Sequence, residues 1–315
     1  MLFSPSARAC AATSFRHHLG LGMLAAAGVL WGLGGVSGRM LSSAGAFSAL
    51  DVAALRMLVG GLALVAIARL TRSPWPRTGR ARTRVVVTGV LCAVFQGCYF
   101  ASVAAGSVAV ATLVTIGLSP VIVVTVECLR ARRLRAGAAV TLTLAVPGLT
   151  LLVRFPAGDG APIGGVLFAT VAAAAFACTV LLNARPLPGL GPVVLAGGGF
   201  LVAAAVLAVP AVLTHSRPVS WSSDAVGWLL VLGIGATAIP YALYFAGLTR
   251  ESASTASVFA LLEPLTATVL SAVAFGEALG IGGWIGAALL CASVTAASAG
   301  RGRSRTGRWP RPQPD

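Results

Sequence analysis

Long apolar stretches alternate with short polar segments along almost the whole chain. An α-helix rises about 1.5 Å per residue, so about 20 apolar residues are needed to cross about 30 Å of hydrocarbon. By this measure the sequence predicts ten membrane-spanning helices, at 19–40, 50–70, 84–104, 107–128, 136–154, 163–184, 192–213, 225–247, 252–275 and 280–299. The expected fold class is therefore an all-α integral membrane protein.

Composition agrees with this pattern, since 57% of the residues are hydrophobic and only 10% are charged. Soluble domains carry about 25% charged residues. The net charge of +15 could indicate nucleic acid binding, but every basic residue is arginine and nearly all arginines lie in short clusters between apolar stretches. No basic face with interleaved aromatic residues is present. We therefore expect the lipid bilayer, and not nucleic acid, as the partner of these charges.

The arginines also predict an orientation, because cytoplasmic loops of membrane proteins are enriched in positive residues. If the N-terminus is cytoplasmic, only Arg154 and Arg217 lie in outside segments, Arg39 and Arg56 lie within spans, and all other arginines are inside. Both termini are then cytoplasmic and the protein is a multi-pass protein of the cytoplasmic membrane. Residues 1–18 are expected to form a cytoplasmic segment, and 300–315 a basic, disordered cytoplasmic tail.

An internal repeat divides the chain into two halves of five predicted spans each, at 19–154 and 163–299. Aligning the chain with itself gives the following matches: Tyr99-Phe100-Ala101 with Tyr244-Phe245-Ala246, Gln96 with Tyr241, Trp31 with Phe176 and, after one gap, Pro120 with Pro264. An odd number of spans per half requires that the second half be inserted upside down. Inverted repeats of this kind place a binding site near the membrane midplane and permit alternating access.

From about residue 20 to 299 the chain resembles the EamA-type transporters of the drug/metabolite transporter superfamily. The matching residues are Leu30-Trp31-Gly32, Arg39, Arg56, Glu263-Pro264 and Gly276-Glu277. The resemblance implies ten helices in two five-helix repeats and export of metabolites, amino acids or toxic compounds. Two positions depart from the family pattern: Arg133 stands where a glutamate is usual, and Phe176 where a tryptophan is frequent.

Polar residues within the spans are the candidates for substrate binding, because polar groups in hydrocarbon must be paired or face a cavity. Gln96 and Tyr99 share one helix face, and so do Thr237, Tyr241 and Tyr244. The repeat superposes these two faces, and we expect them to form walls of a central site. The alternative is that these tyrosines only pack helices together. For Trp31, the family resemblance implies a position facing the centre.

Hydroxyl groups and prolines mark two further spans. Thr112 and Thr115 form a stripe that leads to Pro120, and Ser257 belongs to a stripe that includes Pro264. These hydroxyls are candidates for the transport pathway, although hydroxyls in membrane helices most often bond to their own backbone. The prolines are candidate hinges.

Among the charged side chains within spans, three are weighed as functional candidates. Arg56 has no partner that can be named from the sequence, and a structural contact is favoured over substrate binding. Glu127 and Glu263 are candidates for proton coupling. For Glu127 a surface pair with the neighbouring arginines is favoured, and for Glu263 a position facing neighbouring helices.

Several functions are disfavoured by the residues that the chain lacks. The six cysteines include no CxxC pair, and the three histidines have no metal-ligand spacing, so neither a metal nor another cofactor is expected. No GxxxxGK[ST] loop for ATP is present. The spans contain no histidine and no paired carboxylates, so an enzyme is not expected. The sequence predicts a secondary transporter that moves a small metabolite, amino acid or drug-like compound by alternating access. Export is favoured, with coupling to protons or another ion left open. The alternative is a non-transporting membrane sensor or scaffold.

Overall fold

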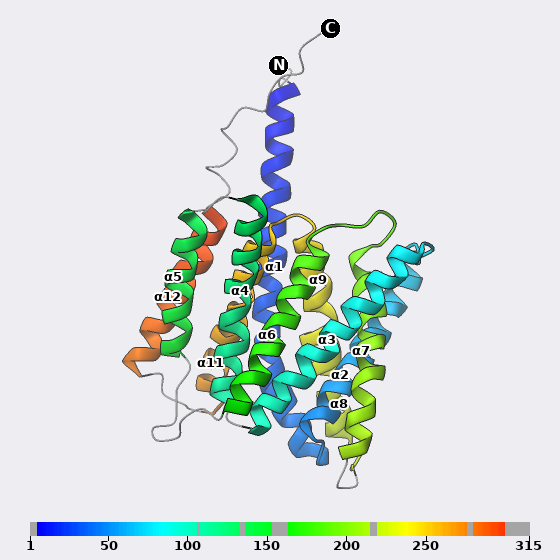
Figure 1. Ribbon diagram of the computed structural model, residues 1–315. Helices are drawn as coiled ribbons and strands as arrows, with labels where there is room; N and C mark the ends of the chain where they lie inside the picture. Colours follow the sequence, from blue (N-terminus) through cyan, green and yellow to red (C-terminus); the bar gives the residue numbers. More distant parts are fainter. Residues whose placement is uncertain are drawn as a thin grey trace.

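The computed structural model describes residues 5–105, 108–132, 136–152, 163–214, 219–275 and 280–299, and in these ranges all regular structure is helical (Figure 1). The helices are α1 (Pro5–Gly45), α2 (Ala49–Leu70), α3 (Gly79–Ala105), α4 (Val108–Ala131), α5 (Ala136–Leu152), α6 (Ile163–Asn183), α7 (Pro192–Thr214), α8 (Ser223–Leu230), the π-helix η1 (Val231–Ala238), α9 (Ile239–Leu248), α10 (Ala253–Phe259), α11 (Leu262–Phe275) and α12 (Ile281–Ala299).

The predicted class of an all-α, multi-pass membrane protein is confirmed. Within the described ranges, nine helical stretches are long and apolar enough to cross a membrane. The predicted span 136–154 corresponds to α5, which has 17 residues and contains the shorter apolar stretch Ala139–Leu152. Helix α1 begins at Pro5, so most of the predicted segment 1–18 continues the first span as a helix. The predicted disordered tail, 300–315, lies outside the described residues.

The predicted span 225–247 is one helical stretch whose middle is a π-helix. Pro240 has no N–H to donate to the carbonyl of Ala236, so the regular hydrogen-bond ladder cannot continue here. The helix widens instead: the N–H of Ile239 donates to the carbonyl of Ile234, five residues back. The hydroxyl of Thr237 donates to the carbonyl of Leu232 at 2.8 Å. π-Helical segments are frequent at functional sites.

The predicted span 252–275 is broken into α10 and α11. Pro264 removes the hydrogen bond to the carbonyl of Ala260, which accepts from the N–H of Glu263 at 3.0 Å instead. The N–H of Leu261 likewise donates to the carbonyl of Val258, three residues back, at 3.0 Å. The chain between α10 and α11 therefore forms a turn that is tighter than an α-helical turn. Gly28 of α1 lies against this break, and a Cβ there would stand 2.6 Å from the carbonyl oxygen of Phe259.

The most extensive helix contacts join the first half of the chain to the second. Helix α2 packs on α7, α5 on α12, α3 on α6 and α7, α4 on α6, and α1 on α9 and α11, while α2 also contacts η1. Glycines permit the closest crossings, as is usual in membrane helices. Where α5 crosses α12, a Cβ on Gly286 would lie 2.6 Å from the carbonyl oxygen of Gly148.

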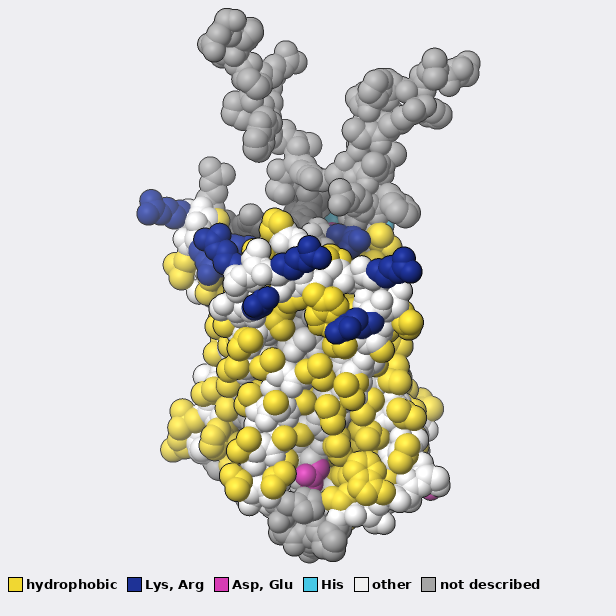
Figure 2. Space-filling view, turned by 90° about the vertical axis from the view of Figure 1, so that its right-hand side faces the viewer, with side chains coloured by type: hydrophobic (Ala, Val, Ile, Leu, Met, Phe, Trp, Pro, Cys, Tyr) yellow, Lys and Arg dark blue, Asp and Glu magenta, His cyan; other side chains and the backbone are white. Residues whose placement is uncertain are grey.

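The arginines gather at one end of the bundle, which we call the arginine-rich end. Figure 1 shows that α1 starts and α12 finishes at this end, and α2, α4, α6 and α9 also finish there. Figure 2 shows arginine side chains around this end of one face, above a broad band of apolar side chains. The opposite end carries the first turns of α2 and α8, with Asp51 and Asp224.

Candidate functional site

Four aromatic side chains from both halves of the chain meet in the interior. We call them the central aromatic cluster: Trp31 of α1, Phe176 of α6, and Tyr241 and Tyr244 of α9. The ring of Trp31 lies 4.8 Å from Tyr241, 4.9 Å from Tyr244 and 6.4 Å from Phe176 between centroids. Trp31, Tyr241 and Tyr244 are buried. The repeat partners Trp31 and Phe176 are therefore in contact.

Two polar atoms of this cluster are buried without a hydrogen-bond partner. Among the side chains that the structure describes, they are the indole Nε1 of Trp31 and the hydroxyl of Tyr244, with the hydroxyl of Ser119 on α4 as a third. Leaving a buried donor unsatisfied costs about 1–3 kcal/mol. A buried polar atom that no other side chain satisfies is a candidate to hydrogen-bond a water molecule or a solute.

Two charged side chains of opposite sign lie within the spans. The Nε of Arg56 on α2 donates to the hydroxyl of Thr237 in η1 at 3.1 Å, which is the partner that the sequence could not name. Glu263 stands in the first turn of α11, next to the helix break. Among the described residues, no salt bridge joins Arg56 to Glu263.

The sequence interpretation assumed a regular helix across residues 252–275 and favoured a position of Glu263 facing neighbouring helices. In the structure this span is interrupted between α10 and α11, and Glu263 lies in the first turn of α11. Regular helical spacing therefore does not relate Glu263 to the serines of α10.

The predicted wall from the first half lies on α3 and α4. The hydroxyls of Tyr99 and Thr112 are hydrogen-bonded at 3.1 Å. Gln96 is buried one turn before Tyr99 and one turn after Cys92, which belongs to the same apolar cluster as Tyr241. The structure thus places Trp31, Tyr241 and Tyr244 in contact, joins Tyr99 to Thr112 by a hydrogen bond between α3 and α4, and buries Gln96 on the same helix as Tyr99.

Two of the predicted site hydroxyls bond to backbone instead. Thr115 donates to the carbonyl of Ala169 on α6 at 3.2 Å, and Ser257 donates to the carbonyl of Ser254 in its own helix at 2.9 Å. The two prolines differ as well. Pro120 lies within the continuous helix α4, whereas Pro264 stands beside the break between α10 and α11.

Polar contacts near the arginine-rich end were missed from the sequence. Glu127 of α4 accepts hydrogen bonds from the backbone N–H of Ser254, at 3.3 Å, and from its hydroxyl, so a carboxylate from one half holds the first turn of α10 in the other. His17 of α1 contacts Glu251 at 2.9 Å, just before α10. The signal available in the sequence was only that these polar side chains interrupt or border apolar spans.

We expect Glu127→Ala to destabilise this end of the bundle. Hydrogen bonds to a charged group contribute about 1.5–3 kcal/mol each, and the negative charge also suits the start of a helix. The variant should therefore melt several degrees below the wild type in detergent, as measured by differential scanning fluorimetry. Glu127→Gln, which can still accept from Ser254, should lose less. An unchanged melting temperature for Glu127→Ala would show that this contact contributes nothing.

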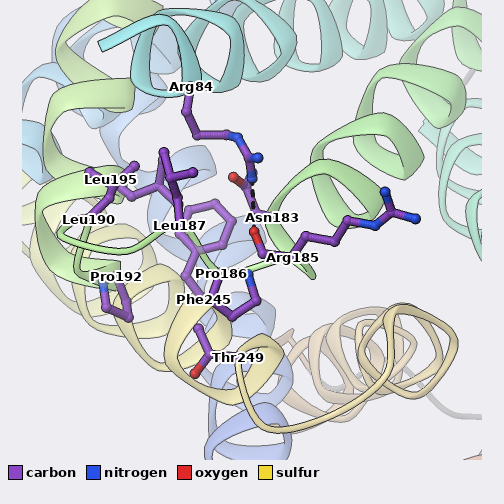
Figure 3. A pocket seen from close by; sticks show the side chains of 10 residues that line it. All are labelled: Arg84, Asn183, Arg185, Pro186, Leu187, Leu190, Pro192, Leu195, Phe245 and Thr249. Carbon is purple, nitrogen blue, oxygen red and sulfur yellow. Dashed lines mark hydrogen bonds between the residues drawn. The ribbon is translucent and has the colours of Figure 1, made fainter. Parts of the chain in front are cut away.

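A pocket lies at the arginine-rich end, beside the aromatic cluster (Figure 3). It is formed where α3 and α7 begin and α6 and α9 finish, and its lining residues are Arg84, Asn183, Arg185, Pro186, Leu187, Leu190, Pro192, Leu195, Phe245 and Thr249. Phe245 connects it with the cluster, since its ring lies 6.1 Å from Tyr241 and 6.2 Å from Tyr244.

The fold and the site define a polytopic helical membrane protein with a polar, aromatic centre between two halves. The sequence profile of the EamA-like transporter family matches this chain twice, over residues 18–154 and 163–299. The chain therefore belongs to the EamA-like transporter family, as the sequence resemblance predicted.

Similar proteins agree with this assignment. A Bacillus subtilis (strain 168) protein named "Uncharacterized transporter YwfM" is 30% identical, over 80% of this chain and 85% of that protein. An Archaeoglobus fulgidus protein named "Uncharacterized transporter" is 28% identical, over 62% of this chain and 69% of that protein. A solved crystal structure shares the fold, with a TM-score of 0.76 and 21% identity over 90% of this chain and 98% of that chain. The family and these names indicate a membrane transporter rather than an enzyme.

Proposed function

We propose that this protein is a secondary transporter that exports a small metabolite, amino acid or drug-like compound across the cytoplasmic membrane by alternating access. Its spans form two inverted five-helix repeats, and both termini are in the cytoplasm. The shorter helix α5 is counted as a span together with the nine longer ones, which gives ten. The proposal rests above all on the family, and it is supported by the symmetry of the helix contacts and by the aromatic side chains that meet at the centre.

The contact pattern supports the inverted repeat. If each helix of the first half is exchanged for its equivalent in the second, the α3–α6 contact becomes the contact of α1 with α9, and the α4–α6 contact becomes that of α1 with α11. The pairs α2–α7 and α5–α12 map onto themselves. A pseudo-twofold axis through the midplane accounts for all four relations. Transporters with this symmetry open alternately to the two sides around a fixed central site.

The central site favours a zwitterionic solute with an apolar body. Arg56 offers a positive charge and Glu263 a negative one, and no salt bridge joins them among the described residues, so each can bind an opposite group of the solute. The donors of Trp31 and Tyr244 lack partners. Their rings provide an apolar wall that can contact the solute's body. Gln96, Tyr99, Thr112 and Tyr241 complete the site, while Thr115 connects α4 to α6 and Ser257 bonds within its own helix.

The orientation follows from the arginine-rich end. Positive residues accumulate on the cytoplasmic side of membrane proteins, so this end faces the cytoplasm. The breaks beside Pro240 and Pro264 act as hinges, because a π-segment and an interrupted helix resist bending less than a regular helix does. Glu263 stands at one of these breaks, and it is the carboxylate through which a proton or another cation would couple to movement.

The test is a comparison of metabolites in the medium and inside cells that express the wild type, Tyr244→Phe, Tyr244→Ala or an empty vector, with expression matched by immunoblot. We expect a few compounds to accumulate outside only with the wild type. Tyr244→Phe keeps the ring but removes the unsatisfied hydroxyl, so its melting temperature should equal or exceed that of the wild type while export falls.

If Tyr244→Phe exports at the wild-type rate, the hydroxyl of Tyr244 does not take part in substrate binding. If none of the four strains differs while the protein is well inserted, constitutive export is excluded. Uptake assays with labelled compounds would then be the next experiment. A chain that moves no solute in either direction but still alters gene expression would be a sensor.

A further inference from the structure

The pocket at the arginine-rich end has apolar walls and a basic rim. Its walls come from the segment between α6 and α7 and from the helix ends around it, with Leu187, Leu190, Leu195 and Phe245. Its basic residues are Arg84 and Arg185, and no acidic side chain is among the described residues that line it. This combination suits a ligand that is both anionic and partly apolar.

Arg84 is positioned by the end of α6. One terminal nitrogen, Nη1, donates to the carbonyl of Leu182 and, at 3.1 Å, to that of Arg185. Among the described residues, neither Nε nor Nη2 of Arg84 has a hydrogen-bond partner, so the guanidinium still has donors for a ligand. Figure 3 shows Arg84 beside Asn183, and Arg185 extending away from the apolar side chains. Arginine is well suited to bind phosphate, because its donors are planar and permanently charged.

The surroundings place this pocket at the membrane surface. Exposed arginines follow one another from the last turn of α2 into α3: Arg69, Arg72, Arg77, Arg80 and Arg82. Figure 2 shows arginine side chains gathered at this end of the molecule. Trp75 stacks under Arg69 at 4.9 Å, and tryptophan is enriched at the level of lipid headgroups. Phe245 is almost completely buried and closes the pocket toward the central aromatic cluster.

We propose that this pocket binds the phosphate headgroup of an anionic phospholipid from the cytoplasmic leaflet. Arg84 binds the phosphate through its remaining donors, and Leu187 and Leu190, the partly exposed leucines of the lining, contact the glycerol at the mouth of the pocket. Basic pockets between helix ends on the cytoplasmic side are known lipid sites in membrane proteins. The choice of leaflet rests on the proposed orientation of the transporter, whereas binding itself does not depend on transport.

The experiment is native mass spectrometry of the purified full-length protein in detergent, titrated with phosphatidylglycerol or phosphatidylcholine. We expect one phosphatidylglycerol to bind per protein, at least about fivefold more tightly than phosphatidylcholine, because one arginine near a membrane surface contributes about that factor. Inorganic phosphate at millimolar concentration should not displace the lipid, since it cannot contact the apolar walls.

Variants of the pocket test its location. Arg84→Gln should weaken phosphatidylglycerol binding about fivefold, and Arg84→Lys, which keeps the charge, should lose less. Leu190→Trp fills the pocket without touching the bonds of Arg84 and should also prevent binding. Arg77→Gln, in the same arginine-rich segment but outside the pocket, is the matched control and should bind as the wild type does. Each variant is first checked for folding by size exclusion and melting temperature.

Three results would overturn the proposal: equal binding of the two lipids, displacement by inorganic phosphate, or binding that survives both Arg84→Gln and Leu190→Trp. Labelling of Leu190→Cys by a membrane-impermeant maleimide added outside intact cells would contradict the assignment of the pocket to the cytoplasmic leaflet. Loss of lipid selectivity in a protein that still exports its substrate would contradict only the lipid site. A protein that binds the lipid but exports nothing would contradict only the proposed function.

Discussion

Arg56→Gln is expected to reduce export at least about tenfold. The glutamine can still donate to the hydroxyl of Thr237, which Arg56 contacts at 3.1 Å, so the α2–η1 contact is largely preserved. What is lost is the positive charge that Arg56 places beside Thr237 in η1. Hydrogen bonds to charged groups contribute about 1.5–3 kcal/mol, and each 1.4 kcal/mol corresponds to about tenfold in affinity.

The measurement is the initial rate of appearance of the exported compound in the medium, normalised to the amount of protein in the membrane. Arg80→Gln removes an equally positive side chain from the exposed start of α3 and should export like the wild type. If Arg56→Gln and Arg80→Gln export equally fast, Arg56 has only a structural role. Glu263→Gln should lower the rate as well, because it removes the opposite charge from the same space.

Gly32→Val is expected to have the largest effect on stability. Helix α1 crosses α11 at this glycine, and a Cβ there would stand 2.5 Å from the Cβ of Thr266 and 2.9 Å from the backbone nitrogen of Ala267. The helices would have to move apart. Overpacking of this kind costs about 1–3 kcal/mol or more, and we expect the melting temperature to fall by roughly 5–10 °C.

Gly35→Val is the matched control, because it lies one turn further along α1 and a Cβ there would meet nothing within 4 Å. Both variants introduce the same β-branched residue into the same helix, so any difference between them reports the crossing with α11. Fluorescence-detected size exclusion should show aggregation or poor yield for Gly32→Val only. Equal melting temperatures would mean that α1 can shift away from α11 at no cost. The crossing also gives a physical reason for the glycine that follows Trp31 in the family motif.

The helical spans could be predicted because they depend on local properties of the sequence. The predicted spans 50–70 and 163–184 agree closely with α2 (Ala49–Leu70) and α6 (Ile163–Asn183), since length and apolarity alone determine whether a segment can cross a membrane. The clustering of arginines at one end also follows from their spacing along the chain. The family could be recognised because its motifs are short and keep their order.

The partners of the polar side chains could not be predicted, because they depend on how each helix is rotated and placed. Arg56 and Thr237 are 181 positions apart in sequence. The rotation of Thr237 depends on the π-helix, and that of Glu263 on the break before Pro264. The rotation of 100° per residue of a regular α-helix therefore does not give the direction of the side chains in these two segments. The only local signals were Pro240 and Pro264 themselves, since proline inside a span removes one backbone hydrogen bond.

The two halves of this protein share a contact pattern but differ in stiffness. The interrupted segments, η1 and the α10–α11 break, both lie in the second half, whereas their equivalents α3 and α4 are continuous. The first half contains prolines within helices as well, Pro120 in α4 and Pro147 in α5, but both helices continue through them. If the protein works by the proposed alternating access, the interrupted spans of the second half would bend more than α3 and α4, so the inward-open and outward-open states would not be mirror images. The resting preference for one state would be set by sequence differences between the repeats.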